Sequence, residues 1–191
     1  MKHKKEDLQE IPKTFYSFID EKPFENCADC GKGLLNNNTE YLIERVYRNH
    51  KEYKTSEVIF DYAICMDCAM RLHQEMSNES KQKLQQFFQS NLNLEKRNQL
   101  IRDKKSIEES LSTCLVSGDD LVECEEYQVC AHCVGDKVFM GNPPYMISGK
   151  ILDRIMHLLS NETQDILNGF YDKIRTPSPG IYEPDPKLVL F

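Results

Sequence analysis

Two Cys-x-x-Cys motifs constrain the fold of this 191-residue chain more than any other feature of its sequence. The first is Cys27-Ala-Asp-Cys30 and the second is Cys65-Met-Asp-Cys68. Two intervening residues allow one tight turn to present both sulfur atoms, and four cysteine sulfurs are a common donor set for a closed tetrahedral zinc site. The motifs therefore predict one structural zinc ion, and the chain between them must fold back to bring the two pairs together.

The residues around the motifs indicate how the chain returns. Gly31 follows the first pair and can adopt the left-handed backbone that a cysteine knuckle needs. Segments 41–47 and 58–64 are rich in β-branched and aromatic residues, which predicts a β-hairpin. The second pair is followed by a helical stretch at 66–74, and Ser77 or Asn78 can cap a second helix.

This order of knuckle, hairpin and Cys-x-x-Cys at a helix start resembles the treble-clef zinc fingers over about residues 24–76. The resemblance implies that Cys27 and Cys30 are the knuckle ligands and that Cys65 and Cys68 are the helix ligands. The motif is specific for zinc and for the fold, but it does not indicate a function.

An internal repeat extends the same pattern. Sliding residues 64–88 by 83 positions onto 147–171 produces identities at Ile64, Arg71, Ser77, Asn78, Glu79, Leu84 and Phe87, and upstream Cys27, Gly31 and Leu34 match Cys114, Gly118 and Leu121. The fold class predicted is α+β, with two tandem treble-clef-like modules, each closed by a helix that covers its own hairpin. The alternative is a chance resemblance between two capped helices.

The second copy is expected to be degenerate. Its register places Ser117, Ser148 and Ile151 where the first copy has Cys30, Cys65 and Cys68, which leaves Cys114 as the sole retained ligand. A second zinc ion remains an alternative, and its ligands would be Cys114, Cys124, Cys130 and Cys133. Cys130 and Cys133 fall on a predicted strand, where residues three apart point to opposite faces. A local turn at residues 131–132 would be needed to bring these two sulfurs together.

Composition shifts divide the chain into five parts. These are an N-terminal arm (1–22), a zinc-binding module (23–91), a charged helical connector (92–111), the second module (112–174) and a proline-rich tail (175–191).

The overall charge and the cysteine content limit the functional classes. Twenty-four basic and 31 acidic residues give a net charge of -7, which disfavours nucleic acid as the default partner. The chain shows neither a secretory signal nor a membrane-spanning run, so a cytoplasmic location is expected. In that reducing compartment paired cysteines usually hold metal.

The expected function is therefore a non-enzymatic protein-interaction or adaptor role, with protein as the partner and the oligomeric state open. One alternative is a nucleic-acid-associated regulator that uses the local basic residues Lys96, Arg97, Arg102, Lys104 and Lys105. A metal-dependent nuclease would require His50 and His73, and a thiol redox protein would use Cys130 and Cys133.

Overall fold

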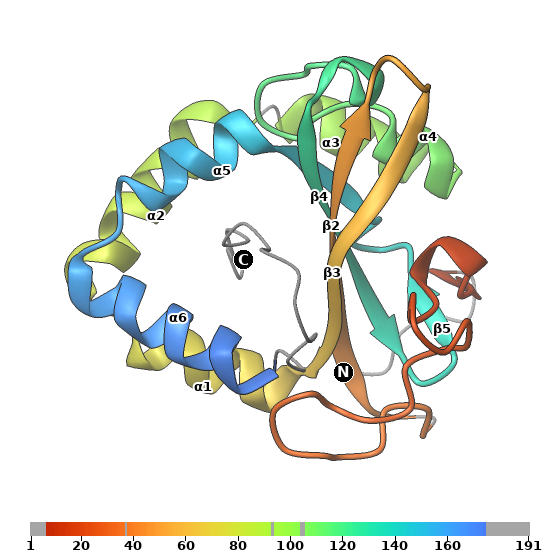
Figure 1. Ribbon diagram of the computed structural model, residues 1–191, viewed down its shortest axis with the longest axis horizontal. Helices are drawn as coiled ribbons and strands as arrows, with labels where there is room; N and C mark the ends of the chain where they lie inside the picture. The colour runs from red at the N-terminus through yellow and green to blue at the C-terminus, as the bar shows by residue number, and fades with distance from the viewer. Residues whose placement is uncertain (1–6, 37, 93, 104–105, 175–191) are drawn as a thin grey trace.

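The computed structural model describes residues 7–36, 38–92, 94–103 and 106–174, which form an antiparallel β-sheet with helices arched along one side (Figure 1). The strands are β1 (Leu8–Glu10), β2 (Glu40–His50), β3 (Thr55–Cys65), β4 (Glu126–Val134), β5 (Lys137–Phe139) and β6 (Tyr145–Ser148). The helices are α1 (Met66–Glu75), α2 (Asn78–Asn91), α3 (Leu94–Arg102), α4 (Ile107–Leu111), α5 (Gly149–Met156) and α6 (Asn161–Ile174), with short 3-10 turns η2 (Lys13–Phe15) and η3 (Leu121–Glu123). The described chain is therefore a mixed α and β structure.

The two halves of the chain share this sheet. Its strand order is β1-β5-β4-β2-β3, and β6 also pairs with β4. The central pair is β2 with β4, which run antiparallel from Glu40–Val134 to Arg48–Glu126. The strand before the second cysteine pair and the strand after the second knuckle therefore belong to one continuous hydrogen-bonded surface.

The predicted hairpin and its two helices form where the sequence indicates them. Strands β2 and β3 pair along their length, α1 begins directly after Cys65, and the Ser77 hydroxyl caps α2 by accepting a hydrogen bond from the Ser80 amide. The connector contains two short helices, because Ser106 starts α4 with a new capping box. The proline-rich tail at 175–191 lies outside the described residues.

Each closing helix was expected to cover its own hairpin, but side chains of both helices pack against the other half. The Phe170 and Tyr171 rings of α6 pack on Tyr62 and Phe60 of the first hairpin, with ring centroids 5.6 and 4.9 Å apart. On the other side of the arch α2 lies beside α5, and the Arg154 guanidinium sits 5.2 Å from the centre of the Phe87 ring (Figure 1). The second helix of each half thus reaches across to the other half.

The helices cross at the turn between α1 and α2 and the turn between α5 and α6, which are hydrogen-bonded to each other. The Ser77 amide donates to the Thr163 hydroxyl at 3.0 Å, and the Ser160 amide donates to the Ser80 hydroxyl at 2.9 Å. Both accepting side chains are fully buried. Each helix start therefore supplies a hydrogen-bond acceptor to a backbone amide at the start of the other helix, which would otherwise be unpaired. From these turns, α2 and α6 each run across the opposite half of the molecule.

The N-terminal segment covers the opposite side of the sheet. The Arg45 side chain of β2 donates to the carbonyls of Thr14 and Tyr16 and forms a buried 2.6 Å ion pair with Asp61 of β3. Phe15 of the same segment is fully buried. The arm is therefore tied to the sheet by charge-assisted hydrogen bonds as well as by apolar contact.

Candidate metal centre

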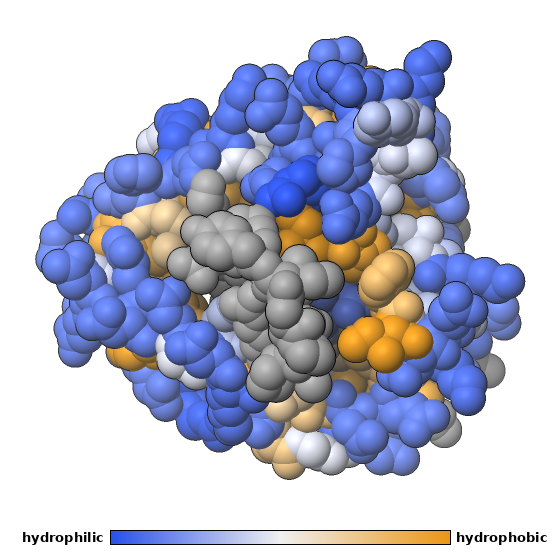
Figure 2. Space-filling view, in the orientation of Figure 1, coloured by the Kyte–Doolittle hydropathy of each residue, from blue (hydrophilic) through white to orange (hydrophobic). Residues whose placement is uncertain are grey.

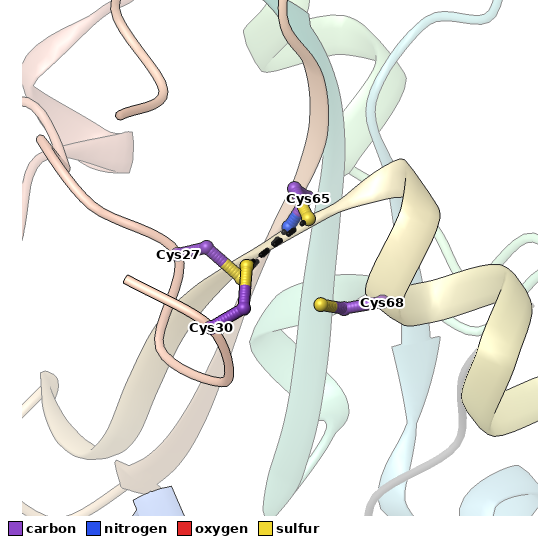
Figure 3. A group of neighbouring side chains, drawn as sticks. All are labelled: Cys27, Cys30, Cys65 and Cys68. Carbon is purple, nitrogen blue, oxygen red and sulfur yellow. Dashed lines mark hydrogen bonds between the residues drawn. The ribbon is translucent and has the colours of Figure 1, made fainter. Parts of the chain in front are cut away.

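Four cysteine side chains converge at the junction of a loop, a strand and a helix. Cys27 and Cys30 lie in the loop before β2, Cys65 is the last residue of β3, and Cys68 lies in the first turn of α1 (Figure 3). Their sulfur atoms all lie within 4.8 Å of one another. This cluster is positioned to hold a metal ion.

The loop that carries Cys27 and Cys30 is held by its backbone. Gly31 has a φ of +73°, and its amide donates to the Cys27 carbonyl at 2.9 Å. The Cys27 amide donates to the Lys32 carbonyl at 2.8 Å, which closes the turn. A further bond at 2.8 Å from the Ala28 amide to the Ala63 carbonyl attaches the loop to β3. The knuckle is therefore joined to the strand that ends in Cys65.

The donor set fits zinc in both chemistry and spacing. A zinc–sulfur bond of about 2.3 Å implies sulfur atoms about 3.8 Å apart along each edge of a tetrahedron. The Cys30 and Cys65 sulfurs are 3.8 Å apart. Four thiolates would complete the tetrahedron, which leaves no position for a water molecule or a substrate.

The local environment shifts the pKa values of three of these thiols in different directions. Burial raises the pKa of Cys65 and that of Cys68, whereas the backbone amide of Lys32 lowers the pKa of the exposed Cys30. The Cys65 amide donates to the Cys27 sulfur at 3.3 Å, as backbone amides do for metal-bound thiolates. A bound zinc ion would supply the positive charge that keeps all four groups deprotonated.

A group of charged residues lies beside Cys68, and the sequence analysis did not identify it. Asp29 is bonded to Arg71 of α1 and to Lys173 of α6, whose ammonium group also donates to the Asp29 carbonyl at 3.0 Å. The bond from Lys173 is the main reason that the pKa of Asp29 is lowered. The Arg71 guanidinium is also 3.8 Å from the Cys68 sulfur. Asp29 lies inside the first motif and could have been suspected, but nothing in the sequence connects Lys173 with it.

The loop around Cys114 has the same backbone with different side chains. Gly118 has a φ of +75° and donates to the Cys114 carbonyl at 2.9 Å, and the Leu115 amide donates to the Met146 carbonyl at 2.8 Å. The Ser148 amide donates to the Cys114 sulfur at 3.3 Å. Burial opposes ionisation of Cys114, but hydrogen bonds from Ser117 and nearby amides outweigh it and lower the pKa.

Cys130 and Cys133 both lie on strand β4 of the sheet. Strand β4 is unbroken, and Cys130 faces Glu44 while Cys133 faces Tyr41 in the pairing with β2. The turn at 131–132 that a second zinc site requires does not form, because both residues are paired with β2. Within the described ranges, the Cys27, Cys30, Cys65 and Cys68 group is the sole set of three or more potential ligands that lie this close together.

The residues proposed for the alternative functions are dispersed. His50 pairs with Glu57 at the hairpin end, whereas His73 is exposed on α1, and neither belongs to a metal-ligand group in the described part of the chain. Arg97 donates to the Asn142 side chain at 2.7 Å and to the Pro143 carbonyl at 2.6 Å, so its guanidinium is engaged within the protein. Lys104 and Lys105, together with the side chain of Lys96, lie outside the described residues.

Comparison with known proteins adds no family assignment: no family model, curated protein or solved structure matches this chain. None of the described helices has both the length and the apolar character needed to cross a membrane.

Proposed function

We propose that this chain is a non-enzymatic zinc-binding protein whose metal-held fold serves as a protein-interaction or adaptor module. The observation that carries the proposal is the closed set of four cysteine sulfurs at zinc-compatible spacing. A zinc ion with four protein ligands holds a fold together and has no open position for catalysis.

The proposal includes an architecture of two tandem treble-clef-like modules, the first with zinc and the second without it. Its support is a set of matching hydrogen bonds. The bonds that close the loop at Gly31 recur at Gly118, and the amide-to-sulfur bond from Cys65 to Cys27 recurs from Ser148 to Cys114 at the same 3.3 Å. Residues 23–91 and 112–174 are the corresponding units.

Protein is the proposed partner, and the cytoplasm is the proposed location. The net charge of -7 disfavours a nucleic-acid backbone, and Arg97, one of the basic residues that could offset this charge, is engaged within the fold. Eight free cysteines are consistent with a reducing compartment.

Metal analysis of the purified full-length protein tests the first part of the proposal. The expected result is about one zinc per chain, released by a strong chelator together with loss of the folded state. A protein that contains no metal and keeps its melting temperature in the chelator would contradict the proposal.

Salt dependence tests the class of partner. A protein partner that stays bound at high salt would support the adaptor role, whereas retention on DNA or RNA that disappears as salt rises would support the nucleic-acid alternative. A variant with Cys65→Ser should lose the protein partner if the metal-held fold forms the binding surface.

A further inference from the structure

A large cavity lies at the end of the molecule opposite the metal centre. It has a volume of about 940 Å³ and opens between the turn of the first hairpin, the loop that follows the second knuckle, and the start of α5. The surface at this end is predominantly hydrophilic (Figure 2). A volume of this size suits a peptide segment or another extended ligand, and it is much larger than a single metal ion requires.

The lining of this cavity is strongly acidic. It contains seven carboxylate side chains against three lysine or arginine side chains. Arg48 is paired with Glu126 at 2.8 Å, and Lys51 lies 3.8 Å from Glu123. In contrast, Glu52, Asp120 and Glu125 make no ion pair within the part of the chain that the structure describes. Among the described residues, no ion pair therefore offsets the negative charge of these three carboxylates.

The carboxylates are spread along the cavity. Among the described residues, none of them belongs to a group of potential metal ligands within 4.8 Å of one another. A bound divalent cation needs several oxygen ligands at about 2.0–2.6 Å from the ion, which such dispersed groups do not provide. The arrangement fits several separate positive charges better than one ion.

Two further residues of the lining are available to a ligand. Tyr53 is 75% exposed at the hairpin turn, and an exposed aromatic ring next to carboxylates attracts lysine and arginine side chains through cation–π contact. Ser148 is only 2% exposed, yet its hydroxyl oxygen has no hydrogen-bond partner and does not cap α5. An unsatisfied buried hydroxyl in the wall of a cavity is a candidate contact for a ligand.

We infer that this cavity binds a lysine- or arginine-rich peptide segment of a protein partner. The inference rests on the proposed adaptor function and specifies where the partner docks and what charge it carries. Charge complementarity selects a basic segment, the Tyr53 ring contacts one of its cations, and Lys150 at the start of α5 lies beside the carboxylates as a local countercharge.

Anisotropy of fluorescein-labelled hexalysine, titrated with the full-length protein as purified, tests the inference. The site variant combines Glu52→Gln, Asp120→Asn and Glu125→Gln, and we expect it to weaken binding at least tenfold. The matched control combines Glu95→Gln, Asp165→Asn and Asp172→Asn, which removes the same number of exposed carboxylates from α3 and α6. Its affinity for hexalysine should stay within twofold of the unmodified protein.

Two aromatic variants sharpen the test. Tyr53→Ala should weaken hexalysine binding about threefold, whereas Tyr53→Phe should retain it because the ring face is preserved. The inference is overturned if the control variant loses as much affinity as the site variant, or if labelled hexaglutamate binds in place of hexalysine.

The outcome for this cavity can be separated from that for the adaptor function. If the site variant loses hexalysine but keeps its protein partner at high salt, the adaptor role stands and the cavity is not its docking site. If hexalysine binding depends on the cavity carboxylates but the protein contains no zinc, the cavity stands and the metal-held adaptor proposal fails.

Discussion

The loop around Cys27 and the loop around Cys114 share a backbone but differ in the atoms that face their centres. Both contain a left-handed glycine and the same closing hydrogen bonds. In the first loop the surrounding positions supply three more sulfurs, whereas the second has Ser117, Ser148 and Ile151 there. The comparison teaches that the turn is specified by glycine and backbone bonds, while the cysteines decide only whether the turn can hold metal.

The two loops also differ in what stabilises them. Beside the second loop, Ile151 of α5 is buried, and burying such a side chain contributes about 2 to 3 kcal/mol. A structural zinc site contributes about 10 to 16 kcal/mol of apparent binding energy that is coupled to folding. The proposed zinc ion should therefore contribute far more to the stability of the first half than any one side chain contributes to the second half.

The largest expected effect comes from replacing the cysteine that both loops have in common, Cys27 in the first and Cys114 in the second. Cys27→Ser should abolish zinc binding and remove most of the roughly 10 kcal/mol that the metal contributes. Cys114→Ser is the matched control, because serine can still accept the amide hydrogen bonds of the second loop, and it should cost about 1 kcal/mol. Zinc content and thermal unfolding measure both effects. Equal losses in the two variants would contradict the assignment of the metal to the first loop.

The reverse experiment adds metal to the second loop. Replacing Ser117, Ser148 and Ile151 together with cysteine reproduces the donor set of the first loop on a matching backbone. We expect zinc content to rise from about one to about two per chain, with a gain of several kcal/mol in the presence of zinc, reduced by the loss of the Ile151 side chain. If the metal content does not rise, the two loops are less alike than their hydrogen bonds indicate.

A pH effect of intermediate size is expected where the two halves meet in the sheet. Glu44 of β2 faces Cys130 of β4 and is 1% exposed, and burial raises its pKa from 4.5 to about 8. Folding therefore favours the protonated acid, so its contribution is complete below pH 4.5 and is lost as the pH rises towards 8. The slope approaches about 1.4 kcal/mol per pH unit, or about 5 kcal/mol over the whole window.

Glu44→Gln isolates this contribution, because an amide keeps the shape and can still accept from the Tyr62 hydroxyl. The difference in unfolding free energy between the two proteins should change steadily from pH 5.5 to 8, with zinc present throughout. A constant difference would show that the carboxyl does not change its protonation state over this range.

The smallest expected effect on the free energy of unfolding is at the two turns where the closing helices α2 and α6 begin. Ser77→Ala and Ser160→Ala should each cost about 1 kcal/mol, because each hydroxyl accepts an amide bond at its own helix start. The two hydroxyls are also 2.9 Å apart, so the double variant should cost less than the sum of the single variants. Urea unfolding of the four proteins measures the coupling, and strict additivity would argue against a direct contact.

Sequence reasoning identified the four-cysteine cluster because its determinants are local. The two Cys-x-x-Cys motifs, Gly31 and the Ser77 cap act within a few residues of themselves, and the structure brings the four sulfurs together as the motifs indicated. The group of Asp29, Arg71 and Lys173 was not predicted, because Lys173 reaches the site from a helix more than a hundred residues away in the sequence.

The sequence alone determined the turns, the hairpin, the helix starts and the four potential ligands, since each follows from short-range spacing and backbone preference. Only the tertiary structure decided which half each closing helix covers, that Glu44 faces Cys130, and that the acidic groups of three separate segments line one cavity. These features depend on the antiparallel pairing of β2 with β4 and on the contact between two helix turns. Such long-range choices are set by the packing of the whole chain, and no local pattern in the sequence encodes them.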